Sequence, residues 1–166
     1  MCWAMEPSDF LGGRTRETPI RRDAQGRWFH GDTPITHPKL VRAFDAWVDV
    51  AEDGRYCLRN DINWAYVAIE GPPLFVRSVA HDATGVRLIL SDGTEEPLRG
   101  ETLRQGKEGA LYCTARGGRL AARFDRSAMA RLEDLIGEDE GGLFVEVGPS
   151  RYYPPTFSDQ AGKVEP

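Results

Sequence analysis

The stretch GRWFHGDTPITHPKLVRAFDAW, residues 26–47, holds two of the three histidines and two of the four tryptophans of this 166-residue chain. Its first five residues, Gly26 to His30, fit a short strand, in which Trp28 and His30 share a face. A Gly31-Asp32 pair follows and is typical of a turn. The beginning of the stretch therefore predicts a strand that ends in a tight turn.

The second half of the stretch changes period and predicts a helix that runs to Val50. Thr36 is the expected N-cap, and Pro38 is tolerated because amides in the first turn have no intrahelical partner. One apolar stripe recurs at helical spacing and is expected to face the core. It consists of Leu40, Val41, Phe44, Trp47 and Val48.

A second helix, in residues 125–136, has similar surroundings. Asp125 is its expected N-cap and Gly137 its expected stop signal. A shift of 88 positions superimposes the two helices, and in both cases an acidic turn and an apolar strand follow. The second stripe consists of Met129, Leu132, Leu135 and Ile136. This agreement predicts an internal duplication.

The remaining segments predict short antiparallel strands between frequent turns. Val86, Leu88 and Leu90 alternate on one face, as do Ile62, Trp64, Tyr66 and Ala68. LYCTARGGRLAARF, residues 111–124, predicts a hairpin whose two-residue Gly117-Gly118 turn is flanked by Arg116 and Arg119. We therefore predict an α+β protein of two small β-rich units, each with one covering helix. The expected segments are an irregular arm (1–18), the two units (19–72 and 73–154) and a flexible tail (155–166).

Composition excludes several classes of protein. The mean hydropathy is -0.46, and no apolar run is long enough for a membrane span. The N-terminus lacks the pattern of a secretory signal, so we expect a cytoplasmic protein. A net charge of -5 argues against binding to duplex nucleic acid. Three widely spaced cysteines, Cys2, Cys57 and Cys113, predict reduced thiols rather than disulfides.

No motif indicates catalysis, a metal site or a cofactor. GETLRQGKE, residues 100–108, has five residues instead of four between its glycines and lacks the Ser or Thr of a phosphate-binding loop. The three histidines, His30, His37 and His81, form no metal-ligand pattern, and no GxSxG elbow is present. We therefore expect a protein that is not an enzyme.

The region around PIRRDAQGRWFHGDTPITHPKLVRAF, residues 19–44, resembles the bacterial family catalogued as domain of unknown function 1285 (DUF1285). The matching residues are Trp28, Phe29, His30, Gly31, Pro34, Ile35, Leu40, Val41 and Phe44. The resemblance continues through DGRYCL and RGGRLAARFDRS and covers about residues 19–154. It departs from the family at RNDINWAYV, residues 59–67, where the family usually has a strand start with Pro, Glu and Lys.

This resemblance implies a duplicated α+β core whose second half is similar to pleckstrin-homology folds. It also implies a cleft between the two halves for a nucleotide-like ligand, and a role in signalling. Our leading hypothesis is accordingly a non-catalytic sensor that binds a nucleotide-like anion between its halves. The proposed stacking surfaces are Trp28, His30 and Trp64. The proposed phosphate ligands are Arg77, Arg116 and Arg119.

Two alternatives stay open. The first is a protein-interaction module that docks a partner, such as a signalling protein, through an exposed strand edge or through the acidic segment 133–140. The second is a hydrolase of unrecognised type, in which His30 would be required for turnover. Individual residues also have a structural alternative, because Trp28, Trp64 and Tyr66 fit a packed core as well as a binding surface.

Overall fold

A computed structural model describes residues 16–156, and the chain divides into two compact units between Gly71 and Pro72. Most of the predicted N-terminal arm, residues 1–15, and most of the predicted tail, residues 157–166, lie outside the described residues.

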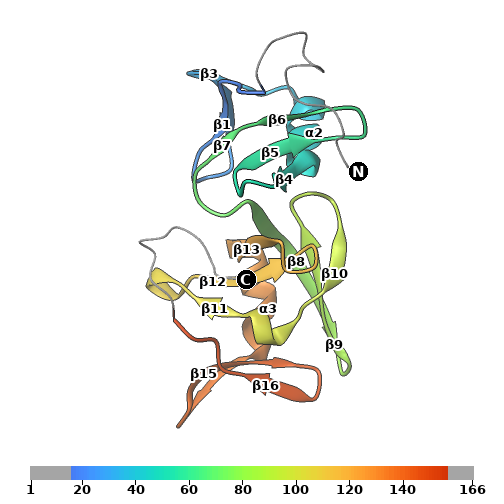
Figure 1. Ribbon diagram of the computed structural model, residues 1–166. Helices are drawn as coiled ribbons and strands as arrows, with labels where there is room; N and C mark the ends of the chain where they lie inside the picture. Colours follow the sequence, from blue (N-terminus) through green and yellow to red (C-terminus); the bar gives the residue numbers. More distant parts are fainter. Residues whose placement is uncertain (1–15, 157–166) are drawn as a thin grey trace. The chain divides into compact units, whose positions relative to one another are not determined.

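The first unit contains one helix and two small sheets (Figure 1). One sheet has four strands in the order β3-β2-β1-β7, with β1 and β7 parallel, and the other is an antiparallel meander in the order β4-β5-β6. The elements are β1 (Ile20–Arg22), β2 (Trp28–His30), β3 (Thr33–Pro34), α2 (Pro38–Trp47), β4 (Val48–Val50), β5 (Tyr56–Arg59), β6 (Trp64–Tyr66) and β7 (Ala68–Ile69).

The core of the first unit forms between α2 and the two sheets. The Trp28 and Phe44 rings meet edge to face, with their centroids 5.3 Å apart. Trp28 also donates an Nε1–H hydrogen bond to Asp45 of α2 at 2.8 Å. Val48, Leu58 and Val67 complete this cluster, against which Trp47 is partly buried. The burial of Phe44 confirms the core position expected from its helical stripe.

Both ends of α2 differ from the prediction. The N-cap position belongs to His37, which makes no side-chain capping bond, and not to Thr36. The helix ends at Trp47, because residues 48–50 leave it to form β4, which pairs with β5. The two valines of this segment are β-branched and favour a strand once a partner strand is available.

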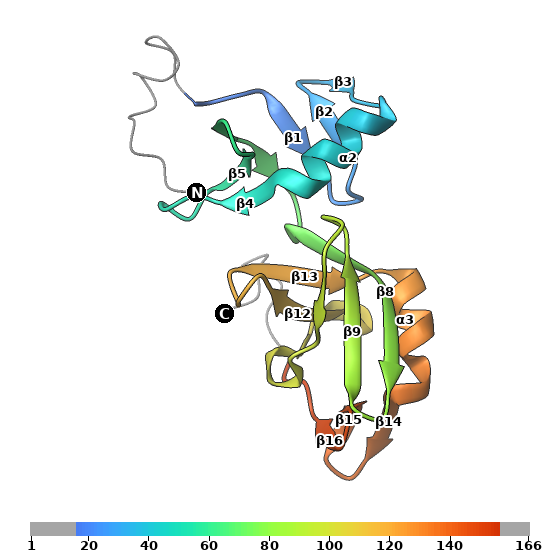
Figure 2. The same ribbon diagram turned by 90° about the vertical axis from the view of Figure 1, so that its right-hand side faces the viewer.

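The second unit combines a six-stranded sheet, in the order β10-β9-β8-β13-β12-β11, with a three-stranded sheet in the order β14-β15-β16. Helix α3 lies alongside β8 of the large sheet (Figure 2). The elements are β8 (Leu74–Asp82), β9 (Gly85–Leu90), β10 (Glu95–Pro97), η1 (Gly100–Thr102), β11 (Arg104–Gln105), η2 (Lys107–Gly109), β12 (Leu111–Ala115), β13 (Leu120–Phe124), α3 (Arg126–Leu132), η3 (Glu133–Leu135), β14 (Ile136–Asp139), β15 (Gly142–Val147) and β16 (Ser150–Tyr152).

The sequence predicts much of the large sheet correctly. Val86, Leu88 and Leu90 of β9 are all buried, as their alternation requires. The hairpin in residues 111–124 is present as β12 and β13, but its loop has four residues, Arg116 to Arg119, instead of two. Arg116 itself adopts a left-handed backbone with φ of 52°, so it belongs to the turn rather than to a strand.

Helix α3 begins as predicted but ends early. The Asp125 side chain accepts a hydrogen bond from the Ala128 amide at 2.9 Å and so caps the helix. The α-helix ends at Leu132, and Gly137 is not a stop signal, because it lies within β14. A Cβ atom at Gly137 would lie 2.5 Å from the Phe144 ring, so close packing explains this glycine.

The fold class is therefore α+β, as predicted. In both units, a helix is followed by a three-stranded antiparallel sheet. A shift of 88 residues takes the start of α2 to the start of α3, and the start of β4 to the start of β14. The strands that precede the two helices are paired differently, since β13 pairs in parallel with β8 whereas β2 has only antiparallel neighbours. Duplication, and the pleckstrin-homology likeness of the second unit, stay predictions.

Candidate functional site

The six residues predicted to bind a ligand are divided equally between the two units. Trp28, His30 and Trp64 lie in the first unit, and Arg77, Arg116 and Arg119 lie in the second. Their convergence on one ligand stays a prediction. Each residue can nevertheless be judged by its own surroundings.

Trp28 is a core residue. Its side chain is 2% exposed, and its indole N–H is already bonded to Asp45. Arg22, which is also buried, lies with its guanidinium carbon 5.7 Å from the centre of the Trp28 ring. A ligand has no free face of this ring on which to stack, so the structural alternative holds for Trp28.

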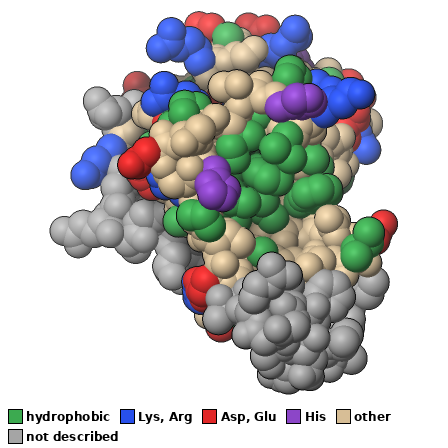
Figure 3. Space-filling model, turned by 90° about the horizontal axis from the view of Figure 1, so that it is seen from above, with side chains coloured by type: hydrophobic (Ala, Val, Ile, Leu, Met, Phe, Trp, Pro, Cys, Tyr) green, Lys and Arg blue, Asp and Glu red, His purple; other side chains and the backbone are tan. Residues whose placement is uncertain are grey.

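His30 is exposed at the end of β2, where it is paired with Ile20 and Thr33. Within residues 16–156, no hydrogen bond or ion pair engages its ring. On one face of the molecule, hydrophobic side chains gather into a patch with histidine at its margin (Figure 3). Leu40 on α2 is 40% exposed and shows that the first unit has accessible apolar surface.

In the second unit, Arg77 and Arg116 form ion pairs with carboxylates. Arg77, at a bulge of β8, lies 3.4 Å from the Asp125 carboxylate that caps α3. Arg119 is exposed in the β12–β13 loop. Arg116 binds Asp92 through Nη2 at 2.7 Å and Nε at 3.0 Å.

The Arg116–Asp92 pair is largely shielded from water, since the Asp92 side chain is 0% exposed. Burial alone would raise the pKa of Asp92, but hydrogen bonds from the Thr94 hydroxyl and amide, and then from Arg116, outweigh it and lower this pKa. A buried carboxylate holds a guanidinium firmly, because separating them would leave an uncompensated charge. Arg116 is therefore a structural residue.

Trp64 lies in a different environment, which we call the arginine–tryptophan cluster and define as Arg16, Arg59 and Trp64. Arg59 of β5 is paired directly with Trp64 of β6, so their side chains share one face of the meander. The guanidinium carbons of Arg16 and Arg59 lie 4.3 and 5.5 Å, respectively, from the centre of the Trp64 ring. Both distances are within the range of cation–π interactions.

Arg16 reaches this cluster because the segment before β1 runs beside β6. The Arg16 carbonyl accepts a hydrogen bond from the Tyr66 amide at 2.9 Å. Its Nη1 donates to the Asn63 side-chain oxygen at 2.6 Å and to the Trp64 carbonyl at 2.5 Å. Arg16 is consequently 2% exposed, and residues 16–18, which we predicted to belong to an irregular arm, have no regular structure but are held against β6.

The cluster combines two neighbouring guanidinium groups with a buried indole N–H that has no acceptor among the described residues. Burial lowers the pKa of the Arg16 guanidinium, and the charge of Arg59 lowers it further. Arg59 Nε lies 3.5 Å from the Asp49 carboxylate, which is longer than a charge-assisted hydrogen bond. Trp64 Nε1 is buried and has no hydrogen-bond acceptor in the described part of the chain. Such an arrangement suits an anion.

The neighbouring Tyr66 contacts both a carboxylate and a guanidinium group. Its hydroxyl donates to Asp53 at 2.7 Å, and the Arg55 guanidinium carbon lies 3.7 Å from the centre of its ring. Arg55 in turn forms two hydrogen bonds with Glu17, at 2.7 and 2.8 Å. The hydrogen bond to Asp53 raises the pKa of Tyr66, so this phenol stays protonated at neutral pH.

Sequence reasoning identified Trp64 but missed its two arginines. Arg16 lies within the predicted arm, and its position depends on bonds to Asn63 and Trp64, which lie far along the chain. Arg59 begins the segment 59–67 that departs from the family pattern. The turn residues Asn60 and Asn63 between Arg59 and Trp64 indicate a hairpin, and a hairpin would have placed these two side chains together.

Comparisons with known proteins bear on the fold. No protein-family model matches the chain, and no curated protein matches it either. A solved DUF1285 family protein from Silicibacter pomeroyi DSS-3 aligns with a TM-score of 0.64 and 22% identity, covering 82% of this chain and 79% of that one. This chain has the DUF1285 fold. A second DUF1285 protein, from Shewanella baltica OS155, aligns with a TM-score of 0.52 and 17% identity over 66% of this chain and 85% of its own.

The resemblance to DUF1285 proteins is thus confirmed at the level of the fold. Both solved proteins are described only as DUF1285 family proteins, so any ligand must be inferred from the residues of this chain. In residues 16–156, no group of three or more His, Cys, Asp or Glu side chains is placed to hold a metal ion. Neither helix in this range is long and apolar enough to cross a bilayer.

Proposed function

We propose that this chain is a non-catalytic, cytoplasmic binding module that holds a small nucleotide-like anion at the arginine–tryptophan cluster. The observation that carries the proposal is the Trp64 indole N–H, which is buried beside two guanidinium groups and has no acceptor among the described residues. Buried N–H groups nearly always have a partner, and an anionic oxygen would supply one.

An anion at this position would act on each member of the cluster. It would accept hydrogen bonds from Trp64 Nε1 and from the Arg59 guanidinium, and charge-assisted bonds of this kind are stronger than neutral ones. It would also reduce the repulsion between Arg16 and Arg59 that lowers the pKa of Arg16. A phosphate group bears the charge that this requires, and an aromatic side chain nearby favours a ligand that also carries a base.

The same residues support binding rather than catalysis. Arginine keeps its proton in proteins, and an indole is only a donor, so neither group transfers protons during a reaction. The Asp49 carboxylate lies 3.5 Å from Arg59 Nε and forms an ion pair with it. A sensor that reports a bound nucleotide needs no further chemistry, in agreement with the signalling role that the resemblance implies.

Thermal shift measurements test the proposal. The purified chain is heated with inorganic phosphate, AMP, ATP or a cyclic dinucleotide, each up to millimolar concentration. A ligand present at 100 times its Kd stabilises the folded state by about 2.7 kcal/mol. For a chain of 166 residues, each kcal/mol raises Tm by about 2–4 °C. We expect at least one anion of the panel to raise Tm measurably.

Variants then locate the site. Arg59→Gln removes one charge, and Trp64→Phe keeps an aromatic ring but removes the indole N–H, so both should abolish most of the ligand-induced shift. Arg42→Gln is the matched control, because Arg42 is an exposed arginine on α2 of the same unit. The proposal is wrong if no anion stabilises the chain, or if the variants and the control respond alike.

A further inference from the structure

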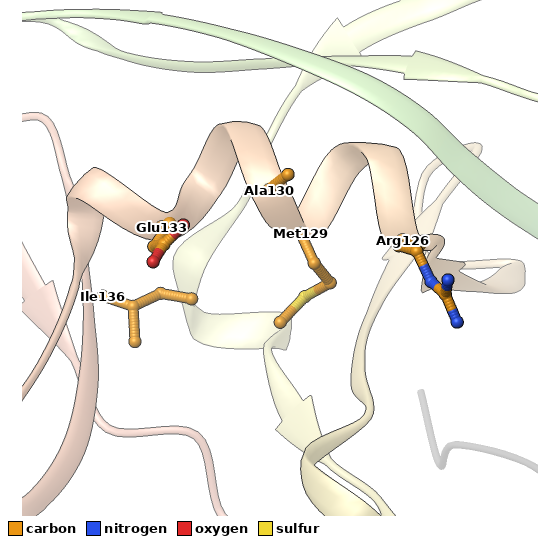
Figure 4. A pocket seen from close by; sticks show the side chains of 5 residues that line it. All are labelled: Arg126, Met129, Ala130, Glu133 and Ile136. Atoms are coloured by element: carbon orange, nitrogen blue, oxygen red, sulfur yellow. The ribbon is translucent and has the colours of Figure 1, made fainter.

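A second surface, on the other unit, has features that the anion site does not explain. An open pocket of about 430 Å³ runs along the exposed side of α3. It is lined by Arg126, Met129, Ala130, Glu133 and Ile136, whose side chains extend from α3, from η3 and from the start of β14 (Figure 4). Met129 and Ile136 belong to the stripe that the sequence assigns to the core, yet both are only half-buried.

Ile136 joins this pocket to a free strand edge. In the three-stranded sheet, β14 pairs only with β15, so its other edge is open within the described part of the second unit. An open edge presents backbone N–H and C=O groups that can pair with a further strand. The apolar pocket and the open edge therefore meet at one residue.

The register of the β14–β15 hairpin shows which backbone groups face outward. The loop has two residues, so its closing pair, Asp139 and Gly142, is a hydrogen-bonded pair, and pairs of this kind alternate along the strands. Glu138 and Ile136 therefore occupy the non-bonded positions and direct their polar backbone groups away from β15. In agreement, the Ile136 amide bonds to the Glu133 carbonyl. The backbone groups of β14 that face away from β15 and are open to a further strand are the N–H and C=O of Glu138 and the C=O of Ile136.

The charge around this edge is negative. Glu133, Asp134, Glu138 and Glu140 are exposed, and none of these four forms an ion pair within residues 16–156. Asp139 differs from them, because it is bound by Arg151 at 3.1 Å and by the Tyr153 hydroxyl at 2.7 Å. A basic segment complements the charge of this edge.

We propose that β14 and the α3 pocket form a docking site for an extended, basic segment of a partner protein, which adds as a strand to the edge of β14. A residue opposite Ile136 in such a strand has its side chain on the same face as Ile136, and therefore beside Met129. An apolar side chain at that position covers both residues. Lysine or arginine side chains of the segment meet Glu138 and Glu133, and its backbone pairs with Glu138.

Residues two apart in a strand share a face, so the residues opposite Ile136 and Glu138 in an added strand lie on one face. The probe is therefore KTVTKTVTK, in which lysine and valine alternate along one face. Fluorescence anisotropy is measured with labelled KTVTKTVTK, with ETVTETVTE, and with KTVTKTVTK that is N-methylated at alternate residues, along the edge that would pair with β14. We expect KTVTKTVTK to bind and the other two peptides to bind at least tenfold more weakly. Hydrogen exchange provides a second readout, because the outward Glu138 amide should become protected only when KTVTKTVTK is present.

Variants separate the contributions of apolar contact, charge and backbone pairing to peptide binding. Ile136→Ser and Met129→Gln reduce the apolar contact, and Glu138→Gln removes charge but keeps the amide. Glu138→Pro removes the outward N–H, which an edge strand tolerates. We expect each variant to weaken peptide binding about three- to tenfold, and Glu138→Pro to bind more weakly than Glu138→Gln. Asp61→Asn is the control, because Asp61 is an exposed acid in the first unit, and it should leave the Kd unchanged. Circular dichroism checks that each variant is folded.

Three results would overturn the inference. The first is no binding of KTVTKTVTK at millimolar concentration, in which case the acids serve only to keep edge strands apart. The second is equal binding of the N-methylated peptide, which would mean simple electrostatic attraction. The third is an unchanged Kd in both the Ile136 and Met129 variants, which would place the peptide elsewhere.

Discussion

Replacing Arg116 by alanine should strongly destabilise the second unit. The substitution removes two hydrogen bonds, of 2.7 and 3.0 Å, from a carboxylate whose side chain is fully buried. Among the described residues, Asp92 would then keep its bonds to the amide and hydroxyl of Thr94. Breaking a buried ion pair on one side costs about 3–5 kcal/mol, and we expect a loss in that range.

The backbone at Arg116 sharpens this expectation. With φ of 52°, a residue other than glycine is strained, by about 1–2 kcal/mol. Alanine keeps that strain, whereas glycine relieves it. Arg116→Gly should therefore be less destabilising than Arg116→Ala by about 1 kcal/mol, although both lose the same guanidinium.

The effect should also depend on pH. The folded-state pKa of Asp92 is lowered, so the stability that this group contributes is present above its unfolded pKa of about 3.9 and is lost as pH falls through the folded pKa. In Arg116→Ala, burial is no longer opposed by the guanidinium, and the pKa of Asp92 rises. The difference between wild type and variant should be largest near pH 7 and smaller below pH 4.

Urea unfolding followed by far-ultraviolet circular dichroism measures these differences. Arg87→Ala is the control, because Arg87 forms an exposed ion pair with Glu95 at 3.2 Å on the same sheet and should contribute about 1 kcal/mol or less. The reasoning is refuted if Arg116→Ala costs no more than the control at pH 7, or if its cost is the same at pH 3 and pH 7.

Three further predictions concern packing and reactivity. Gly137→Ala brings a Cβ atom 2.5 Å from the Phe144 ring and should cost about 1–3 kcal/mol, seen as a lower Tm; an unchanged Tm would show that β14 shifts freely. Phe44→Ala should cost about 3–5 kcal/mol in urea unfolding, and a loss below 1 kcal/mol would contradict the described core. Burial raises the pKa of the Cys113 thiol to about 12. In a Cys2→Ser background, the folded chain should therefore not react with a thiol reagent at pH 8, and fast labelling would show that Cys113 is not buried.

Local patterns predicted those parts of the fold that local sequence determines. Alternation placed Leu88 in a core strand, helical spacing placed Phe44 in the core, and Asp125 was recognised as a cap. The end of α2 could not be predicted in this way. Val48 fits a helical stripe and a strand equally well, and its pairing with Leu58 of β5 decides between them.

The candidate site was predictable only in part, for the same reason. Alternation puts Trp28 and His30 on one face of a strand, but only the packing of α2 shows that one is buried and the other exposed. Arg16 has no local pattern at all. Its position depends on bonds to residues 47 and 48 positions further along the chain, which no periodicity reveals.

A nuclear magnetic resonance titration of the tryptophan indole groups tests the proposed function most directly. The chain has four tryptophans, and the Trp64 indole signal is assigned by its loss in Trp64→Phe. During titration with ATP, and separately with inorganic phosphate, we predict that the Trp64 signal shifts in a saturable manner and that this shift is lost in Arg59→Gln. A Trp64 indole signal that stays in place at saturating anion, while other signals of the chain move, would contradict the proposal.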